Sequence, residues 1–196
     1  MSAVLNPPRI SAEDYLTHER SAVTKSEFHD GQIIAMTGSS RKHNLIALNI
    51  AADLSSQLKK RPCEVYINDM RVKAVNANSY YYPDIAVVCG TPQFAEDAYM
   101  DTLLNPSVII EVLSASTEAY DRGEKFSRYR KIDSLQAYVL VAQDQVMIER
   151  YERLGDVWQL TETVDLNGSV NLACIDCRLS LAEVYDKVFD GEGQVV

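Results

Sequence analysis

The chain has 196 residues, 46% hydrophobic and 24% charged, which is ordinary for a globular protein with one apolar core. Its apolar runs fall short of the roughly 20 residues that a membrane-spanning helix needs, so we expect no membrane association. The net charge of −9 is opposite in sign to the basic excess typical of nucleic-acid-binding proteins. Phosphate binding would therefore depend on segregated basic residues or on a bound metal ion.

The first eight residues lack the basic-then-apolar layout of a signal peptide, so we expect a cytoplasmic protein. In that compartment the four cysteines (Cys63, Cys89, Cys174 and Cys177) are expected to be reduced thiols. The spacing of Cys174 and Cys177 is that of a zinc knuckle. No second such pair and no histidine pair accompanies them, so a structural zinc site is not expected.

A short helix, a hairpin and a long helix are predicted first. Ser11 can cap a helix, with Asp14 at the reciprocal capping position. Asp30-Gly31 predicts a hairpin turn. The long helix is predicted from about Ser40 to Lys60, ahead of Pro62. Its apolar face is expected to consist of residues at helical spacing: Leu45, Leu48, Ala51, Ala52, Ser55 and Leu58.

Strands are predicted next, at Cys63–Asn68, Tyr80–Val88 and Pro106–Leu113. The last two are apolar on both faces, as is typical of central strands covered on both sides. Each of them contains one carboxylate, Asp84 or Glu111. Burying a carboxylate without a partner costs several kcal/mol, so a compensating group is expected, and a divalent cation is the first candidate.

A second helix is predicted to begin at Asp121, with Glu124 in a capping-box position, and to end near Lys131. Three more strands and a closing helix are predicted at Ala137–Ala142, Val146–Arg153, Val157–Thr163 and about Ser180–Val188. Neither an internal repeat nor a linker interrupts this order. We therefore expect one α/β domain that spans residues 1–196.

The two strand acids suggest metal-dependent chemistry. Pro83 lacks an N–H donor, so the sheet is expected to open beside Asp84. Alternation in the second run places Ile109, Glu111 and Leu113 on one face. If the two strands are neighbours, Asp84 and Glu111 could share Mg²⁺, which prefers oxygen ligands and activates water for phosphodiester hydrolysis. The alternative is that each acid pairs with an arginine such as Arg71 or caps a helix.

Lys125 is the cation expected near these acids. It lies four residues after Asp121 and four before Tyr129, so the three share one helical face. An ammonium group near the ion could orient the attacking water, although most lysines lie on the surface. His43, near the start of the long helix, could contact phosphate or activate water; a hydrogen-bonded or solvent-facing histidine is the alternative.

A family pattern runs through the chain in order. It comprises Glu27, Asp30-Gly31, Met36–Asn44, Asp69–Val72, Tyr82–Asp84, Asn105-Pro106, Glu111–Ser114, Thr117–Phe126 and Tyr129. This pattern resembles the Uma family of restriction endonucleases, in the PD-(D/E)XK nuclease superfamily, from about residue 10 to residue 188. The resemblance implies a restriction-endonuclease-like core, in which helices flank a mixed sheet and Mg²⁺ binds at the strand ends.

Carried over position by position, the resemblance implies that Asp84 and Glu111 bind the metal and that Glu27 is an extra N-terminal acid. The superfamily's lysine normally stands two residues after the second acid, where this chain has Leu113. The resemblance implies that Lys125, on the following helix, replaces it. Asp84, Glu111, Lys125 and Glu27 are therefore the expected catalytic residues.

We expect a Mg²⁺-dependent DNA endonuclease in which Mn²⁺ can substitute. Cutting of double-stranded DNA would favour a two-fold homodimer. A nuclease-derived binding or regulatory module without turnover is the alternative, which the acidic charge and the absence of a base-reading motif favour. A third hypothesis is that the protein hydrolyses a small phosphoester or nucleotide.

Overall fold

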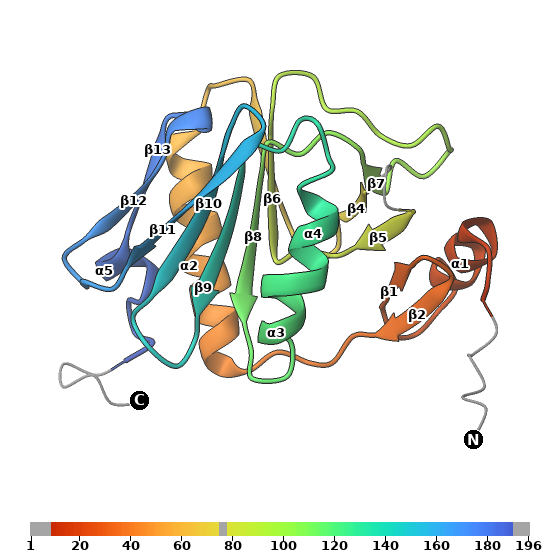
Figure 1. The fold of residues 1–196 in the computed structure, drawn as a ribbon, viewed down its shortest axis with the longest axis horizontal. Coiled ribbons are helices and arrows are strands. Elements are labelled where there is room, and N and C mark those ends of the chain that lie inside the picture. The colour runs from red at the N-terminus through yellow and green to blue at the C-terminus, as the bar shows by residue number, and fades with distance from the viewer. Residues whose placement is uncertain (1–8, 75–77, 190–196) are drawn as a thin grey trace.

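The computed structural model describes residues 9–74 and 78–189, which form a mixed α/β fold with two main sheets (Figure 1). The eight N-terminal residues, on which the expectation about a signal peptide rests, lie outside this range. The longer sheet contains β3 (Cys63–Ile67), β6 (Ile85–Cys89), β8 (Val108–Leu113), β9 (Ala137–Ala142), β10 (Ile148–Leu154) and β11 (Val157–Thr163). Its spatial order is β11-β10-β9-β8-β6-β3.

The second sheet has the order β2-β1-β5-β4-β7. Its strands are β1 (Ser26–His29), β2 (Gln32–Ala35), β4 (Arg71–Ala74), β5 (Ser79–Tyr81) and β7 (Thr102–Leu103). The remaining elements are α1 (Ala12–Glu19), α2 (Arg41–Gln57), α3 (Glu118–Tyr120), α4 (Phe126–Tyr129), α5 (Leu181–Val184), a 3-10 turn (Ala173–Ile175) and the hairpin β12 (Ser169–Leu172) and β13 (Cys177–Ser180). Among the helices of the described ranges, none is long and apolar enough to cross a bilayer.

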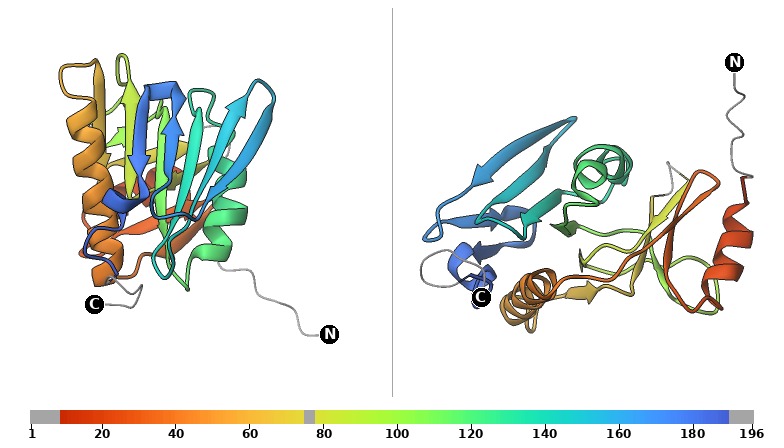
Figure 2. Two further views of the ribbon diagram at one scale, coloured as in Figure 1. Left: turned by 90° about the vertical axis from the view of Figure 1, so that its left-hand side faces the viewer. Right: turned by 90° about the horizontal axis from the view of Figure 1, so that it is seen from below.

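The expected mixed α/β architecture is confirmed, with helices on both faces of the longer sheet (Figure 2). β8 pairs in parallel with β9 and antiparallel with β6. Ile110 and Val112 of β8 pack in one core with α2, while Ile109 and Leu113 pack in a second core with Tyr129 of α4. The predicted burial of β8 on both faces is therefore correct, and Glu111 points to the α3–α4 side.

α2 begins where it was predicted to begin, because the Ser40 side chain accepts a hydrogen bond from the backbone N–H of His43 (3.1 Å). The predicted buried face is correct in part: Leu58 is buried and Leu45 and Ala51 pack against the core, but Leu48, Ala52 and Ser55 are exposed. Ile46, Ile50 and Leu54 are the residues that α2 buries, whereas Leu48 is 62% exposed. These three residues form an i, i+4, i+8 row of larger side chains, which fill the core better than the alanines and serine of the predicted face.

The run Tyr80–Val88, predicted as one strand, is two strands in two sheets. β5 belongs to the shorter sheet, β6 begins the pairing with the longer sheet, and Pro83-Asp84 lies between them. The sheet was expected to open locally beside Asp84. The chain instead leaves one sheet and enters the other at this point. Pro83 explains the break, because it cannot donate a ladder hydrogen bond.

The helix predicted to begin at Asp121 begins earlier, at Glu118, so the capping-box prediction is wrong. Asp121–Lys125 form a π-helical turn between α3 and α4. Asp121 is thus an interior residue of a continuous helical segment, and its carboxylate is buried. Single π-helical turns are rare in proteins, but those that occur are frequently found at functional sites.

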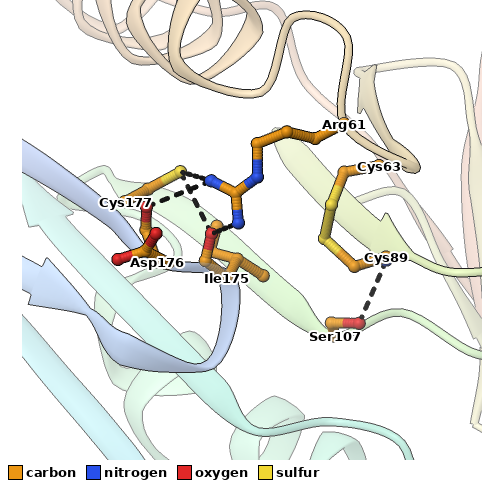
Figure 3. Close-up of a disulfide and its surroundings, with 7 residues drawn as sticks. All are labelled: Arg61, Cys63, Cys89, Ser107, Ile175, Asp176 and Cys177. Carbon is orange, nitrogen blue, oxygen red and sulfur yellow. Dashed lines mark hydrogen bonds between the residues drawn. A yellow bond between two sulfur atoms is a disulfide. The ribbon is translucent and has the colours of Figure 1, made fainter.

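The expectation of four reduced cysteines is also wrong, because a disulfide joins Cys63 to Cys89 (Figure 3). The antiparallel register of β3 and β6 places these two residues opposite each other. Their separation of 26 residues carries no sequence signal for this pairing. Cys174 and Cys177 remain thiols, and the Arg61 side chain binds the carbonyl oxygens of Ile175 and Asp176 beside Cys177.

Replacing both Cys63 and Cys89 by alanine should lower the free energy of unfolding by about 3 kcal/mol, because the closed loop no longer restricts the unfolded chain. Urea denaturation of the oxidised protein measures this loss. Wild-type protein treated with reductant should fall to the stability of the double variant. Equal stability of oxidised wild type and variant would contradict the prediction.

Candidate active site

Asp84 and Glu111 lie side by side at the seam between the two sheets. Ile85 of β6 pairs with Ile110 of β8, and continuing this register by one residue brings Asp84 opposite Glu111. The backbone N–H of Val112 donates to Oδ2 of Asp84 at 2.7 Å. The strands that carry the two acids are therefore neighbours, and both carboxylates border the same cavity.

His43 contacts the first of these acids. Its Nε2 lies 2.8 Å from Oδ1 of Asp84, and both side chains are largely buried. The N-terminal turn of α2, fixed by the Ser40 cap, places the imidazole there. The role of His43 was open from the sequence. In the structure, His43 contacts a candidate metal-binding carboxylate.

Lys125 is buried at 5% exposure and is surrounded by acids. Its Nζ lies 2.9 Å from Oε1 of Glu111, 3.0 Å from Oε1 of Glu27 and 3.5 Å from Oδ1 of Asp121. The π turn places Asp121 and Lys125 four residues apart on the side that faces β8. The alternative of an ordinary surface lysine is therefore excluded.

Neutral groups complete the cluster. The Tyr129 hydroxyl donates to Oε1 of Glu111 at 3.2 Å, and the backbone N–H of Tyr82 donates to Oε1 of Glu27 at 3.2 Å. Asp121 and Tyr129 were not among the predicted site residues, although their four-residue spacing from Lys125 had signalled a shared face.

Arg71 was the alternative partner suggested for Asp84 and Glu111, but it contacts neither of them in the structure. Arg71 instead donates to the Tyr82 hydroxyl at 3.0 Å and contacts Asp101 at 3.4 Å. Glu111 is partnered by Lys125, and Asp84 by His43. The pairing of either acid with Arg71 is therefore not observed.

Burial governs the protonation of this cluster. It raises the pKa of Glu111 well above the ordinary value, and the charges of Asp121, Asp84 and Glu27 raise it further against the opposing effect of Lys125. Burial also raises the pKa of Asp121. Burial opposes the charge on Lys125, but Glu111 and Glu27 outweigh it and raise the lysine pKa well above its usual value. The ammonium group therefore stays charged, while Glu111 and Asp121 resist ionisation.

A cavity of about 510 Å³ opens onto the cluster. Its lining includes the candidate site residues Glu27, His43, Asp84, Glu111, Asp121 and Lys125 together with residues 34–40 of the segment that leads into α2. A second cavity of about 400 Å³ shares Ser40, Ser114 and Gln143 with it and also borders Arg41 and Lys42. Solvent-sized molecules can therefore reach the acids from this side.

The donor set suits a small, hard cation. Asp84 and Glu111 supply carboxylate oxygens beside a cavity, and Mg²⁺ commonly uses one or two carboxylates with water and substrate oxygens in the remaining positions. The Lys125 and Tyr129 contacts of Glu111 both fall on Oε1. Within residues 9–74 and 78–189 no group of three or more His, Cys, Asp and Glu side chains is arranged as a complete metal site.

The chain is similar to known proteins over most of its length. The family model Uma2, described as "Putative restriction endonuclease", matches residues 12–182. Two proteins of Synechocystis sp., "Uncharacterized protein sll1609" and "Uncharacterized protein slr1290", are 36% and 38% identical to it. The alignments cover 88% and 91% of this chain and 98% and 92% of theirs.

A crystal structure from Anabaena variabilis, described as a "putative nuclease belonging to DUF820", has a similar fold. The TM-score is 0.75 at 18% sequence identity, and the match covers 90% of this chain and 98% of that one. At this identity the likeness concerns the fold alone.

Proposed function

Because the chain belongs to the Uma2 family, described as "Putative restriction endonuclease", we propose that it is a Mg²⁺-dependent endonuclease that hydrolyses phosphodiester bonds in DNA. The observation that carries this proposal is the charge imbalance of the site. Glu27, Glu111 and Asp121 surround the buried ammonium of Lys125. Asp84 adds a fourth carboxyl group beside the same accessible cavity. Glu111 and Asp121 favour their neutral forms without metal because burial raises the pKa of both, and a divalent cation would offset the negative charge that forms when they ionise.

Asp84 and Glu111 would hold the ion, and Mn²⁺ would substitute for Mg²⁺. When bound, such an ion lowers the pKa of a water molecule and stabilises charge on the departing oxygen. Glu111 would release its proton on binding, because only the carboxylate is a ligand. The elevated pKa of Glu111 therefore makes metal affinity rise with pH.

Lys125 acts beside that ion as a positioned donor. Glu111 and Glu27 hold two of its N–H groups at 2.9 and 3.0 Å, whereas the contact with Asp121 is longer, at 3.5 Å. The third N–H would turn from Asp121 to orient the attacking water or contact a phosphoryl oxygen. Glu27, the extra N-terminal acid, fixes Lys125 from the shorter sheet. In this proposal the substrate is double-stranded DNA, and the working form is a homodimer, since cuts in both strands need two sites.

Cleavage of supercoiled plasmid tests the activity. Wild-type protein with Mg²⁺ or Mn²⁺ should nick or linearise the plasmid, and EDTA should stop the reaction. The Asp84→Asn variant, with its fold verified by circular dichroism, should be inactive. Full activity of this variant would refute the role of Asp84. Folded wild type that neither cleaves nor binds Mg²⁺ at millimolar concentration in calorimetry would indicate the binding module without turnover.

The His43→Ala variant should bind Mn²⁺ about 10–100-fold more weakly than wild type, as is usual when a hydrogen-bond partner of a ligand is removed. The physical reason is that Nε2 of His43 orients Oδ1 of Asp84. Calorimetric titration measures the change. His43→Gln can place an amide N–H near the position of Nε2 and should recover part of the affinity, while the exposed His18→Ala is the matched control. An unchanged dissociation constant in His43→Ala would contradict this role.

A further inference from the structure

β11 forms one outer edge of the longer sheet (Figure 2). In the part of the chain that the structure describes, β11 pairs with β10 alone. The register is continuous over all seven residues, from Val157 opposite Leu154 to Thr163 opposite Ile148, without a bulge. The other side of β11 is therefore a regular strand edge that is long enough to pair with a further strand.

The turn between β10 and β11 determines which backbone groups face outward. Only Gly155 and Asp156 separate the paired residues Leu154 and Val157, so this pair exchanges hydrogen bonds, as does every second pair after it. The backbone groups of every second β11 residue from Val157 onward thus point to β10. Those of Trp158, Leu160 and Glu162 point away from it.

This edge lacks the usual protection. β11 contains neither proline nor lysine, the residues that most often block strand addition. Three apolar residues around it are exposed: Leu154 at 50%, Val157 at 63% and Leu160 at 49%. The opposite edge of the same sheet differs, because β3 follows directly after Pro62.

We propose that β11 pairs antiparallel with β11 of a second copy, about a two-fold axis at Leu160. This register pairs residue 157 with 163, 158 with 162, 159 with 161, and Leu160 with itself. It is the only antiparallel register that pairs all seven residues of the strand. The outward groups of Trp158, Leu160 and Glu162 then make the hydrogen bonds, and one sheet runs through both copies.

The side chains of the two copies complement each other in this register. On the face that bears Leu160, one row across the four strands reads Glu149, Glu162, then Trp158 and Arg153 of the second copy. Within its own chain, Glu162 faces the like charge of Glu149. In the dimer it also lies beside Trp158 of the second copy, with Arg153 of that copy one strand further away. The central row consists of Tyr151, Leu160 and their symmetry copies.

The opposite face is complementary as well. One row reads Arg150, Thr161, then Gln159 and Glu152 of the second copy, and the last row reads Ile148, Thr163, then Val157 and Leu154. No two like charges meet across the axis. Registers centred on Glu162 would instead place two glutamates together, which is unfavourable. Self-pairing therefore matches both the backbone and the charges of this edge, and it does not depend on the proposed nuclease activity.

Analytical ultracentrifugation and cysteine cross-linking test the interface on the full chain. Wild type should sediment as a dimer, and Leu160→Lys, which places a charge on the axis, should sediment as a monomer. Leu166→Lys, an equally exposed leucine outside the strand, is the matched control and should remain a dimer.

In a Cys174→Ser background, Leu160→Cys should form a disulfide-linked dimer on oxidation, because paired Cα atoms about 5.5 Å apart are within disulfide range. Val164→Cys, also exposed but outside β11, should not. A monomeric wild type would overturn the proposal. A dimer that survives Leu160→Lys and gives no Leu160→Cys cross-link would overturn it too.

Discussion

The Lys125→Met variant should lose about 3–5 kcal/mol of unfolding free energy, one of the largest effects of any single substitution in this chain. The substitution removes the ammonium that lies within 3.0 Å of both Glu27 and Glu111, so negative charge on these buried carboxyl groups is left without a compensating partner. Methionine fills a similar volume, so a cavity contributes little. Chemical denaturation at neutral pH measures the loss.

The exposed Lys59→Met is the matched control and should change stability by less than about 0.5 kcal/mol. Adding Glu111→Gln to Lys125→Met should restore part of the stability, because it removes one of the uncompensated acids. If Lys125→Met and Lys59→Met are equally stable, the ion cluster does not contribute as the geometry requires.

The Glu111→Gln variant should behave in the opposite way, with cleavage reduced at least about a hundredfold while the metal-free protein is as stable as wild type or more so. Activity falls because a candidate metal ligand is lost, which should cost more than the loss of an outer hydrogen-bond partner. Stability is retained because glutamine resembles the protonated carboxyl group that this buried position favours.

The pH dependence separates these effects. The pKa of Glu111 is raised in the folded protein, so its favourable contribution is fully present below the unfolded pKa of about 4.3 and is lost as pH rises through the folded pKa. Asp121 contributes with the same sign. Metal-free wild type should therefore lose stability as pH rises from about 4 through the folded pKa, and Glu111→Gln should show a shallower slope. Identical slopes would contradict the raised pKa.

The strands that carry the candidate acids could be predicted because the information is local. Uninterrupted apolar residues on both faces mark β6 and β8, and a lone carboxylate stands out against them. Pro83 likewise indicated a break, although only the structure shows that the break separates two sheets. Ala137–Ala142 was predicted with its exact bounds because it is likewise an apolar run, and Val157–Thr163 because it follows the Gly155-Asp156 turn.

The remaining features depend on partners distant in the chain. The contact of His43 with Asp84 spans 41 residues, and the disulfide spans 26. The face that α2 buries is decided by the sheet beneath it, since both candidate faces of that helix contain apolar side chains. Asp121 was interpreted as a helix cap because Glu124 three residues later completes a capping-box pattern, whereas the observed N-cap, Thr117, makes no capping hydrogen bond with its side chain.

The position of the ion cluster at the seam of the two sheets affects how genetic data on this protein should be interpreted. Glu27 belongs to the shorter sheet and Glu111 to the longer one, and Lys125, on the helical segment between α3 and α4, contacts both. These contacts therefore also hold the two sheets together. A screen that scores only loss of function would assign such residues to chemistry even where the lesion is architectural. Comparing protein abundance with activity, variant by variant, would separate the fastening role from the chemical one.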